Sequence, residues 1–246
     1  MTQSWLALAK PFANGPVLII FVDTIFEADL SIIHSTDADG IVWVKEVEDY
    51  QRFGVVVTDK DGYMTKIVEK PSTPISKLAN IGLYYIRDVK ALWAGIDHVL
   101  ASPTNKGEFF LTDAFQFMID KGKRILTAEV GGWYDCGKLD TLLETNEALL
   151  RKGAARKPTL PGVTFIDPVL IQDGAHIERS TIGPNVTVET GARITDSTIR
   201  SSIVGRKAII DRARLADSMI GDRVVVENFQ GSLTLGDDSE IRGGQA

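Results

Sequence analysis

Apolar residues in the first part of the chain, up to Arg151, follow two different spacings. Six short runs rich in β-branched and aromatic residues predict strands at residues 17–22, 41–47, 54–58, 64–69, 80–86 and 125–130. Three longer stretches, 88–99, 111–120 and 138–150, place apolar residues three and four positions apart, as amphipathic helices do. Strands and helices in this alternation predict an α/β layer architecture with a largely buried sheet.

From Pro161 onward the chain repeats itself. The pattern Gly-Ala-x-Ile-x-x-Ser-Thr-Ile, which begins at Gly174, recurs 17 residues later from Gly191, and a shorter version begins at Ala213. Aliphatic residues stand five or six positions apart throughout this part, at Ile171, Ile177, Ile182, Val188, Ile194, Ile199, Val204, Ile210, Leu215, Ile220 and Val226.

This spacing predicts a left-handed parallel β-helix of hexapeptide-like repeats. Three steps of this length close one triangular coil, and each short strand directs one aliphatic side chain into a core that the stacked coils share. A β-sandwich would instead show period-two alternation and hairpin turns, which the sequence lacks. Small or glycine corners permit the turns, and the candidates are Gly174, Gly183, Gly191, Gly205 and Gly221.

Residues 152–161 separate the two patterns. This stretch carries Gly153, Pro158 and Pro161 among several basic residues, a composition that breaks regular structure and suits a solvated connection. We therefore predict a first domain over residues 1–151, a linker over 152–161 and a β-helix domain over 162–246.

Composition and charge exclude several classes of function. The chain has 246 residues, 44% of them apolar, with a net charge of −6 and no cluster of Lys and Arg, so nucleic acid is not an expected partner. The run at 17–22 is far shorter than the roughly 20 residues that cross a bilayer. Cys136 is the single cysteine, and the first residues lack a secretory signal. We therefore expect a cytoplasmic protein without a membrane partner.

One carboxylate stands where a sheet would present it to a ligand, and a second lies in a short motif later in the chain. Asp23 follows the apolar run at 17–22, and the carboxyl ends of strands are where open α/β sheets bind their ligands. Asp135 lies in the segment Trp-Tyr-Asp-Cys-Gly at 133–137. Two hard oxygen ligands together with phosphate oxygens and water suit Mg²⁺. The alternative for Asp23 is that it caps a following helix.

A second group of residues suits a sugar phosphate. Gly54 opens a strand after Phe53, and Glu69-Lys70-Pro71 ends the next one. A carboxylate can accept hydrogen bonds from ring hydroxyls while an ammonium binds the phosphate. Asn80 could hydrogen-bond a hydroxyl. The alternatives are a solvated strand end for 69–71 and a simple bulge at Gly82. Glu108, Thr112 and Asp113 are expected to cap and pack a helix.

In order and spacing, these segments resemble the sugar nucleotidyltransferase family, also called nucleoside-diphosphate-sugar pyrophosphorylases. The likeness is greatest to long-form glucose-1-phosphate thymidylyltransferases, which carry a C-terminal β-helix. Val22, Phe53 and Cys136 depart from the family, which usually has glycine, tyrosine and threonine at these positions. The resemblance implies a Rossmann-like mixed sheet, a sugar 1-phosphate and a nucleoside triphosphate as substrates, and Mg²⁺. It also implies catalytic roles for Lys70, Asp23 and Asp135, metal binding by Asp23 and Asp135, and substrate binding by Gly54, Glu69, Lys70, Asn80 and Gly82.

One part of the family pattern has no match in this sequence. The family begins with a strand and a Gly-x-Gly-Thr-Arg loop that cradle the triphosphate, and no segment here has that form. We therefore expect an incomplete sheet in which the run at 17–22 loses a neighbour. A partner chain, a second copy of this chain or a rearrangement would fill the position, so we expect a homo-oligomer or complementation by another chain. A trimmed sequence is equally compatible.

Three hypotheses about function follow. The first is a nucleotidyltransferase that forms an NDP-sugar, dTDP-glucose by resemblance, and pyrophosphate; whether this chain alone is active stays open because the triphosphate loop is missing. The second is a noncatalytic regulatory or scaffolding subunit of an intact nucleotidyltransferase. The third is a β-helix acyltransferase with His176 as its general base, the least favoured of the three because His176 is the only histidine in the repeats.

Overall fold

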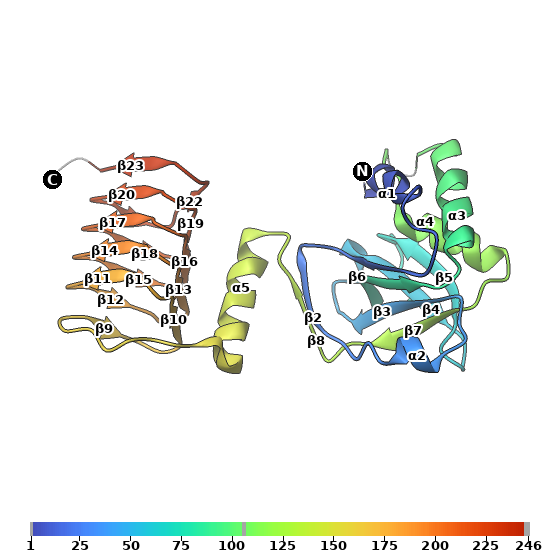
Figure 1. Ribbon diagram of the computed structural model, residues 1–246, viewed down its shortest axis with the longest axis horizontal. Helices are drawn as coiled ribbons and strands as arrows, with labels where there is room; N and C mark the ends of the chain where they lie inside the picture. The colour runs from blue at the N-terminus through green and yellow to red at the C-terminus, as the bar shows by residue number, and fades with distance from the viewer. Residues whose placement is uncertain (1, 105–106, 244–246) are drawn as a thin grey trace. The chain divides into compact units, whose positions relative to one another are not determined.

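The computed structural model describes residues 2–104 and 107–243 (Figure 1). The chain divides into two compact units, Met1–Tyr134 and Asp135–Ala246, and the fold of each is considered separately. In the described part of the chain, no helix is both long enough and apolar enough to span a membrane.

The first unit is built on a mixed sheet, as predicted. Its strand order is β5-β4-β6-β3-β7, and β1 also pairs with β6. β3 and β7 run parallel, whereas the other pairs are antiparallel. The strands of this sheet are β1 (Val17–Ile20), β3 (Gly40–Glu46), β4 (Gly54–Thr58), β5 (Met64–Glu69), β6 (Leu78–Ile86) and β7 (Ile125–Glu129). Two short strands, β2 (Thr24–Glu27) and β8 (Gly132–Asp135), form a small sheet of their own.

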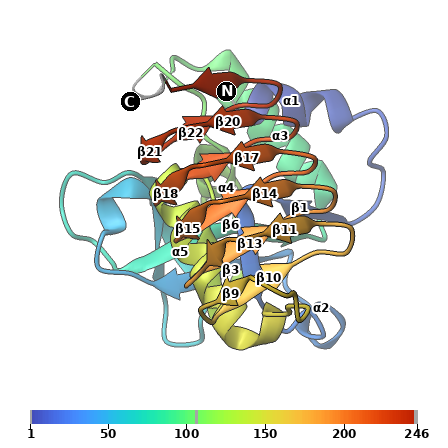
Figure 2. The same cartoon turned by 90° about the vertical axis from the view of Figure 1, so that its left-hand side faces the viewer.

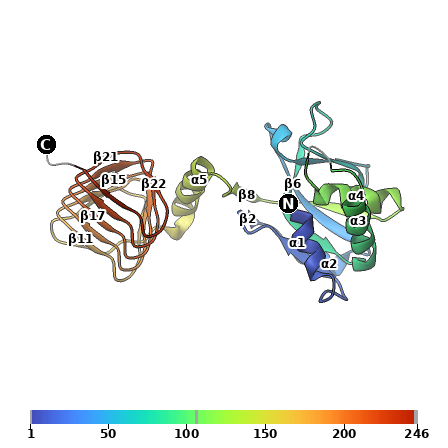
Figure 3. The ribbon, with the colours of Figure 1, turned by 90° about the horizontal axis from the view of Figure 1, so that it is seen from above.

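Alternation along β3 builds apolar layers on both faces of the sheet. Val42 and Val44 pack into a cluster with residues of α3 (Val89–Ala101) and α4 (Leu111–Asp120), and α1 (Thr2–Ala9) joins that side. Ile41 and Trp43 point the other way and pack with residues of β2 and α2 (Ile32–Ser35). Successive strand residues face opposite sides, so a strand buried on both faces is a continuous apolar run. Figure 3 shows α3 and α4 together on one face of the sheet.

One edge of β1 bears exposed apolar side chains. Val17 to Ile20 pair with Ile86 to Leu83 of β6, and in the described part of the chain no strand pairs with the other edge. Leu18 and Ile20 are 44% and 46% exposed. An apolar edge of this kind is a template for strand addition. That a partner fills this position stays a prediction.

The second unit is a parallel β-solenoid, consistent with the predicted left-handed β-helix. Three parallel sheets of five strands each form its sides (Figure 2). The first sheet comprises β10 (Val169–Ile171), β13 (Val186–Val188), β16 (Ser202–Val204), β19 (Met219–Ile220) and β22 (Thr234–Leu235). The second comprises β11 (His176–Glu178), β14 (Arg193–Thr195), β17 (Ile209–Asp211), β20 (Val225–Glu227) and β23 (Glu240–Arg242). The third comprises β9 (Thr164–Phe165), β12 (Thr181–Ile182), β15 (Thr198–Arg200), β18 (Arg214–Ala216) and β21 (Gln230–Gly231).

A helix lies against one side of the solenoid. α5 (Leu139–Leu149) contacts β13 and β16, and its Asn146 forms two hydrogen bonds with the solenoid. The amide nitrogen of Asn146 donates to the Asn185 carbonyl at 3.2 Å, and its oxygen accepts from the Thr187 hydroxyl at 2.6 Å. A short helical segment, η2 (Leu150–Ala154), continues the chain, and Arg156 then bridges to Leu170.

The repeated serines tie consecutive coils together from inside the solenoid. The Ser197 hydroxyl donates to the Thr195 carbonyl at 2.7 Å and accepts from the Ala213 amide of the next coil at 3.0 Å. The Ser180 hydroxyl accepts the Ser197 amide in the same way at 3.0 Å. Each serine thereby gives a buried backbone amide of the next coil an acceptor. This explains why serine recurs at a fixed place in the repeat.

The solenoid corners use glycine for two different reasons. Gly174 and Gly191 adopt positive φ values of 81° and 75°, which glycine tolerates without strain. At Gly205 the limit is space, because a Cβ there would lie 2.7 Å from Gly221 of the next coil. Other corners place non-glycine residues at positive φ, such as Arg179 and Asp196, which stack as an ion pair at 2.7 Å. The predicted glycine corners therefore form only part of the turn chemistry.

Replacing Ser197 with Ala should destabilise the solenoid by about 1–3 kcal/mol, because the buried Ala213 amide loses its acceptor. All four tryptophans, Trp5, Trp43, Trp93 and Trp133, precede Asp135. The urea midpoint of the solenoid's unfolding transition, followed by far-UV circular dichroism, should therefore fall. The midpoint of the transition followed by tryptophan fluorescence should not change. Ser232→Ala, at an exposed site, is the control. A shift no larger than that of the control would contradict the structural role of the serine ladder.

Candidate functional site

Three side chains converge on Gly54, the first residue of β4. A Cβ at this position would lie 2.2 Å from the Asn80 amide nitrogen, 2.7 Å from the Thr112 methyl group and 2.8 Å from a Glu69 carboxylate oxygen. Contacts below 3.0 Å are almost never seen for real Cβ atoms. The missing side chain is therefore what allows residues from β5, β6 and α4 to meet at one point.

Asn80 is fixed by hydrogen bonds on both sides of its amide. The residue is 9% exposed on β6. Its nitrogen donates to the Gly54 carbonyl at 2.8 Å, and its oxygen accepts a hydrogen bond from the Tyr84 hydroxyl. Burial, and next the negative charge of Glu69, raises the pKa of Tyr84 well above its ordinary value of 10.0. Tyr84 is therefore a permanent donor that sets the orientation of the Asn80 amide.

Glu69 ends β5 and Lys70 follows it, beside the first turn of α4. The Thr112 hydroxyl donates to the Glu69 carboxylate at 3.2 Å. Lys70 has a positive φ of 45°, and its amide donates to the Phe53 carbonyl at 2.9 Å. The Lys70 ammonium lies 5.6 Å from the centre of the Phe110 ring. The structure therefore brings Gly54, Glu69 and Asn80 together and places Lys70 at their margin.

Thr112 belongs to this cluster, although the sequence pattern suggested only helix capping and packing for it. The residue is 4% exposed and lies on the face of α4 that also buries Leu111 and Phe115. The sequence signal for this role is a hydroxyl on an otherwise apolar, buried helix face. A buried polar group requires a hydrogen-bond partner, which here is Glu69.

Gly82 has a different neighbour. This residue has a φ of 80°, and a Cβ built on it would lie 2.9 Å from Phe21. The Phe21 amide donates to the Gly82 carbonyl at 2.9 Å, and its ring packs edge-on against Tyr84 with centroids 5.7 Å apart. The glycine is therefore needed for close approach of Phe21, and a sugar-binding role for Gly82 stays a prediction.

The two predicted metal carboxylates lie in different compact units. Asp23 is exposed in the turn between β1 and β2, and because a strand follows it, the alternative of a helix-capping aspartate is wrong. Asp135 ends β8, and one of its oxygens accepts from the Gly137 amide at 2.9 Å. Within residues 2–104 and 107–243, no three His, Cys, Asp or Glu side chains cluster as a metal site. Metal binding by Asp23 and Asp135 stays a prediction, which rests on the preference of hard divalent cations for carboxylate oxygens.

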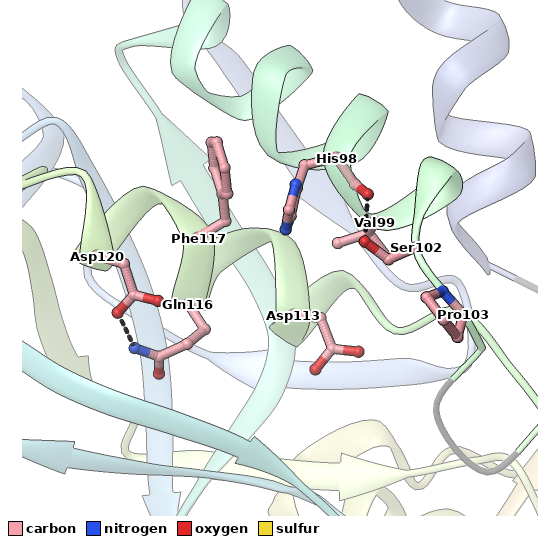
Figure 4. Close-up of a pocket in the computed structure, with 8 residues that line it drawn as sticks. All are labelled: His98, Val99, Ser102, Pro103, Asp113, Gln116, Phe117 and Asp120. Carbon is pink, nitrogen blue, oxygen red and sulfur yellow. Dashed lines mark hydrogen bonds between the residues drawn. The ribbon is translucent and has the colours of Figure 1, made fainter.

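Two of the histidines line cavities of their own. His176 is exposed on β11 in a shallow cavity of about 390 Å³, with Glu178, Arg193 and Thr195. His98 lies on α3 and stacks on Phe117 of α4, with ring centroids 4.6 Å apart. It lines a separate pocket of about 340 Å³ between these helices (Figure 4). Neither cavity is lined by Gly54, Glu69, Lys70 or Asn80.

Comparison with known proteins decides the family. The model of the family described as nucleotidyl transferase matches residues 7–152, which include the whole cluster around Gly54. The chain belongs to the nucleotidyl transferase family. The family recognised from the motifs is therefore confirmed, together with its mixed sheet and the β-solenoid that follows.

Three relatives illustrate the family, and one of them is named for glucose 1-phosphate. The bifunctional protein GlmU of Methanococcus aeolicus is 29% identical over 90% of this chain and 57% of its own length. A glucose-1-phosphate thymidylyltransferase of Streptomyces griseus is 28% identical over 90% of this chain and 69% of its own length. The low-salt glycan biosynthesis nucleotidyltransferase Agl11 of Haloferax volcanii is 31% identical over 87% of this chain and 66% of its own length. The chain thus spans little more than half to about two thirds of these relatives.

A solved structure supports the same assignment. A Bacillus anthracis protein assigned as a glucose-1-phosphate thymidylyltransferase, crystallised with a sucrose, shares 26% identity. It superimposes with a TM-score of 0.52 over 63% of each chain. The chain therefore shares a fold with a protein assigned to the same class as its Streptomyces griseus relative.

Substituting Gly54 with Ala should destabilise the first unit by about 1–3 kcal/mol, because the added methyl group overlaps Asn80, Thr112 and Glu69. Urea unfolding followed by tryptophan fluorescence measures the effect. Gly15→Ala is the matched control, since a Cβ there meets nothing within 4 Å. Equal unfolding midpoints for the two variants would contradict the tight convergence on Gly54.

The stability of the first unit should fall as the pH rises above 10. The raised pKa means that folded Tyr84 keeps its proton while the unfolded chain loses it, so the unfolded state binds fewer protons. Each pH unit above 10 should remove up to about 1.4 kcal/mol of unfolding free energy. Tyr84→Phe should be less stable than wild type at pH 8 but lose less stability between pH 10 and 11.5. Parallel curves for both proteins would refute this assignment.

Proposed function

We propose that this chain binds a sugar 1-phosphate, with glucose 1-phosphate as the expected ligand, in the cluster around Gly54. The observation that carries the proposal is the convergence of Glu69, Asn80 and Thr112 on a residue without a side chain, with Lys70 beside them. Glu69 and Asn80 supply acceptors and donors for ring hydroxyls, and the Lys70 ammonium supplies the charge for a phosphate. Gly54 lets these side chains approach its backbone closely. Gly54 and Gly82 are the remaining proposed substrate-binding residues.

The reaction we propose is nucleotidyl transfer. A phosphate oxygen of the sugar 1-phosphate attacks the α-phosphorus of a nucleoside triphosphate in line, the bond to the bridging oxygen of the β-phosphate breaks, and pyrophosphate leaves. The product is an NDP-sugar, and the thymidylyltransferase relative makes dTDP-glucose the first candidate. Such a transfer needs no covalent protein intermediate, so the protein contributes positioning and charge neutralisation.

Within this reaction Lys70 would hold the attacking phosphate and reduce its charge repulsion with the triphosphate. Asp23 and Asp135 are the proposed ligands of a divalent cation, for which Mg²⁺ is the candidate because both ligands are hard oxygens. When bound, the cation would neutralise charge on the phosphates. We place this function in the cytoplasm and expect a homo-oligomer or a complementing chain.

Replacing Lys70 with Met should weaken glucose 1-phosphate binding about tenfold or more, because a charged hydrogen bond to phosphate contributes about 1.5–3 kcal/mol. Isothermal titration calorimetry of the 246-residue chain measures the dissociation constant. Lys66→Met, which removes an exposed lysine of β5, the strand that precedes Lys70, is the control. If wild type does not bind, or if both variants bind like wild type, the proposal fails.

Pyrophosphate release with Mg²⁺, glucose 1-phosphate and each nucleoside triphosphate separates the remaining hypotheses. Release that is lost in Asp23→Asn supports a complete transferase. Tight sugar phosphate binding without release by any nucleotide supports a noncatalytic subunit of another nucleotidyl transferase. Acyl transfer that depends on His176 would favour the acyltransferase hypothesis.

A further inference from the structure

The first turn of α4 contacts both members of the Glu69-Lys70 pair. Thr112, the second residue of the helix, donates its hydroxyl to Glu69 at 3.2 Å. Phe110, the residue immediately before the helix, has its ring centre 5.6 Å from the Lys70 ammonium. At the start of α4, Thr112 thus contacts Glu69 and Phe110 contacts Lys70, the residue next to Glu69.

The backbone of Lys70 has an unusual conformation beside this helix end. Its φ of 45° lies in the left-handed region, where a residue with a Cβ is strained. Pro71 follows, and a residue before proline ordinarily prefers an extended conformation. The bond from the Lys70 amide to the Phe53 carbonyl, at 2.9 Å, fixes the strand end in this unusual conformation. The lysine is exposed and the phenylalanine half-buried, so the ring is the more firmly placed partner.

We propose that Phe110 is a positioning residue that holds the Lys70 ammonium for phosphate through a cation–π interaction. The inference rests on the proposed binding of a sugar 1-phosphate by Lys70. An aromatic face attracts an ammonium without neutralising its charge, in contrast to a carboxylate. A lysine side chain has four rotatable bonds, and restricting them before the ligand arrives lowers the entropy lost on binding. Phe110 acts through Lys70 and does not itself contact the phosphate.

The first test is a pair of substitutions that separate ring electrons from apolar bulk. Phe110→Leu keeps an apolar side chain but removes the ring, and should raise the dissociation constant for glucose 1-phosphate about two- to fivefold, the worth of an exposed cation–π contact. Phe110→Tyr keeps the ring and should bind within about twofold of wild type. If residue 110 had a purely structural role, Phe110→Leu and Phe110→Tyr variants of equal stability would bind glucose 1-phosphate equally well.

A series of fluorinated phenylalanines at position 110 tests whether the effect of Phe110→Leu comes from the ring electrons or from a change in folding. One, two and three ring fluorines withdraw electrons progressively while the shape changes little, so the logarithm of the dissociation constant should rise stepwise. In a Lys70→Met background the series should have no effect, because the two residues act as a unit. Nuclear magnetic resonance should also show the Lys70 ε-methylene protons shifted upfield by the ring, and released in Phe110→Leu.

Each outcome distinguishes this inference from the function on which it rests. If wild type does not bind glucose 1-phosphate, the proposed function fails and the inference fails with it. If wild type binds, Lys70→Met weakens binding and the Phe110 series leaves it unchanged, the inference alone is overturned. Stepwise weakening that disappears in the Lys70→Met background supports it.

Discussion

The absence of a side chain at Gly54 is the constraint on which the candidate site depends. Asn80, Thr112 and Glu69 come from β6, α4 and β5, and they can approach one another only because β4 offers a bare backbone position between them. The Thr112 hydroxyl donates to the Glu69 carboxylate and the Asn80 amide donates to the Gly54 carbonyl, so both acceptor groups and the amide are oriented before any ligand arrives. The fold contributes precision here by bringing three elements to one point, and each element is anchored in the same apolar layer.

Both compact units solve a similar problem with small polar side chains. In the first unit, the Asn80 amide joins the β4 backbone to the Tyr84 hydroxyl. In the solenoid, Ser197 joins a carbonyl of its own coil to an amide of the next. In each case a small polar side chain pairs with a buried backbone group, and leaving such a group unpaired costs more than a hydrogen bond contributes.

The sequence predicted the regular parts of this protein well. β4, β5 and α4 were placed at their observed limits, because continuous β-branched runs and a three-and-four spacing leave little ambiguity. β2 and β8 were missed, since each has four residues and no pattern of its own. Gly54 and Glu69 were predicted to belong together from their spacing and the family resemblance, but the contribution of Thr112 depends on a contact between distant segments. The neighbour of Gly82, Phe21, likewise comes from another strand and could not be inferred from local pattern.

The coil lengths of the solenoid bear on how such a domain can change in evolution. Along the second sheet, His176 is in register with Arg193, Arg193 with Ile209, Ile209 with Val225 and Val225 with Glu240. The steps are therefore 17, 16, 16 and 15 residues long, and successive coils differ by at most one residue. Each coil meets only its neighbours through the same kinds of contact. A gene duplication or deletion that removes or adds one whole coil would preserve every inward-facing position, whereas a shift of a single residue within a strand would turn its aliphatic side chain toward water. The height of the solenoid is therefore free to vary between descendants in a way that its cross-section is not.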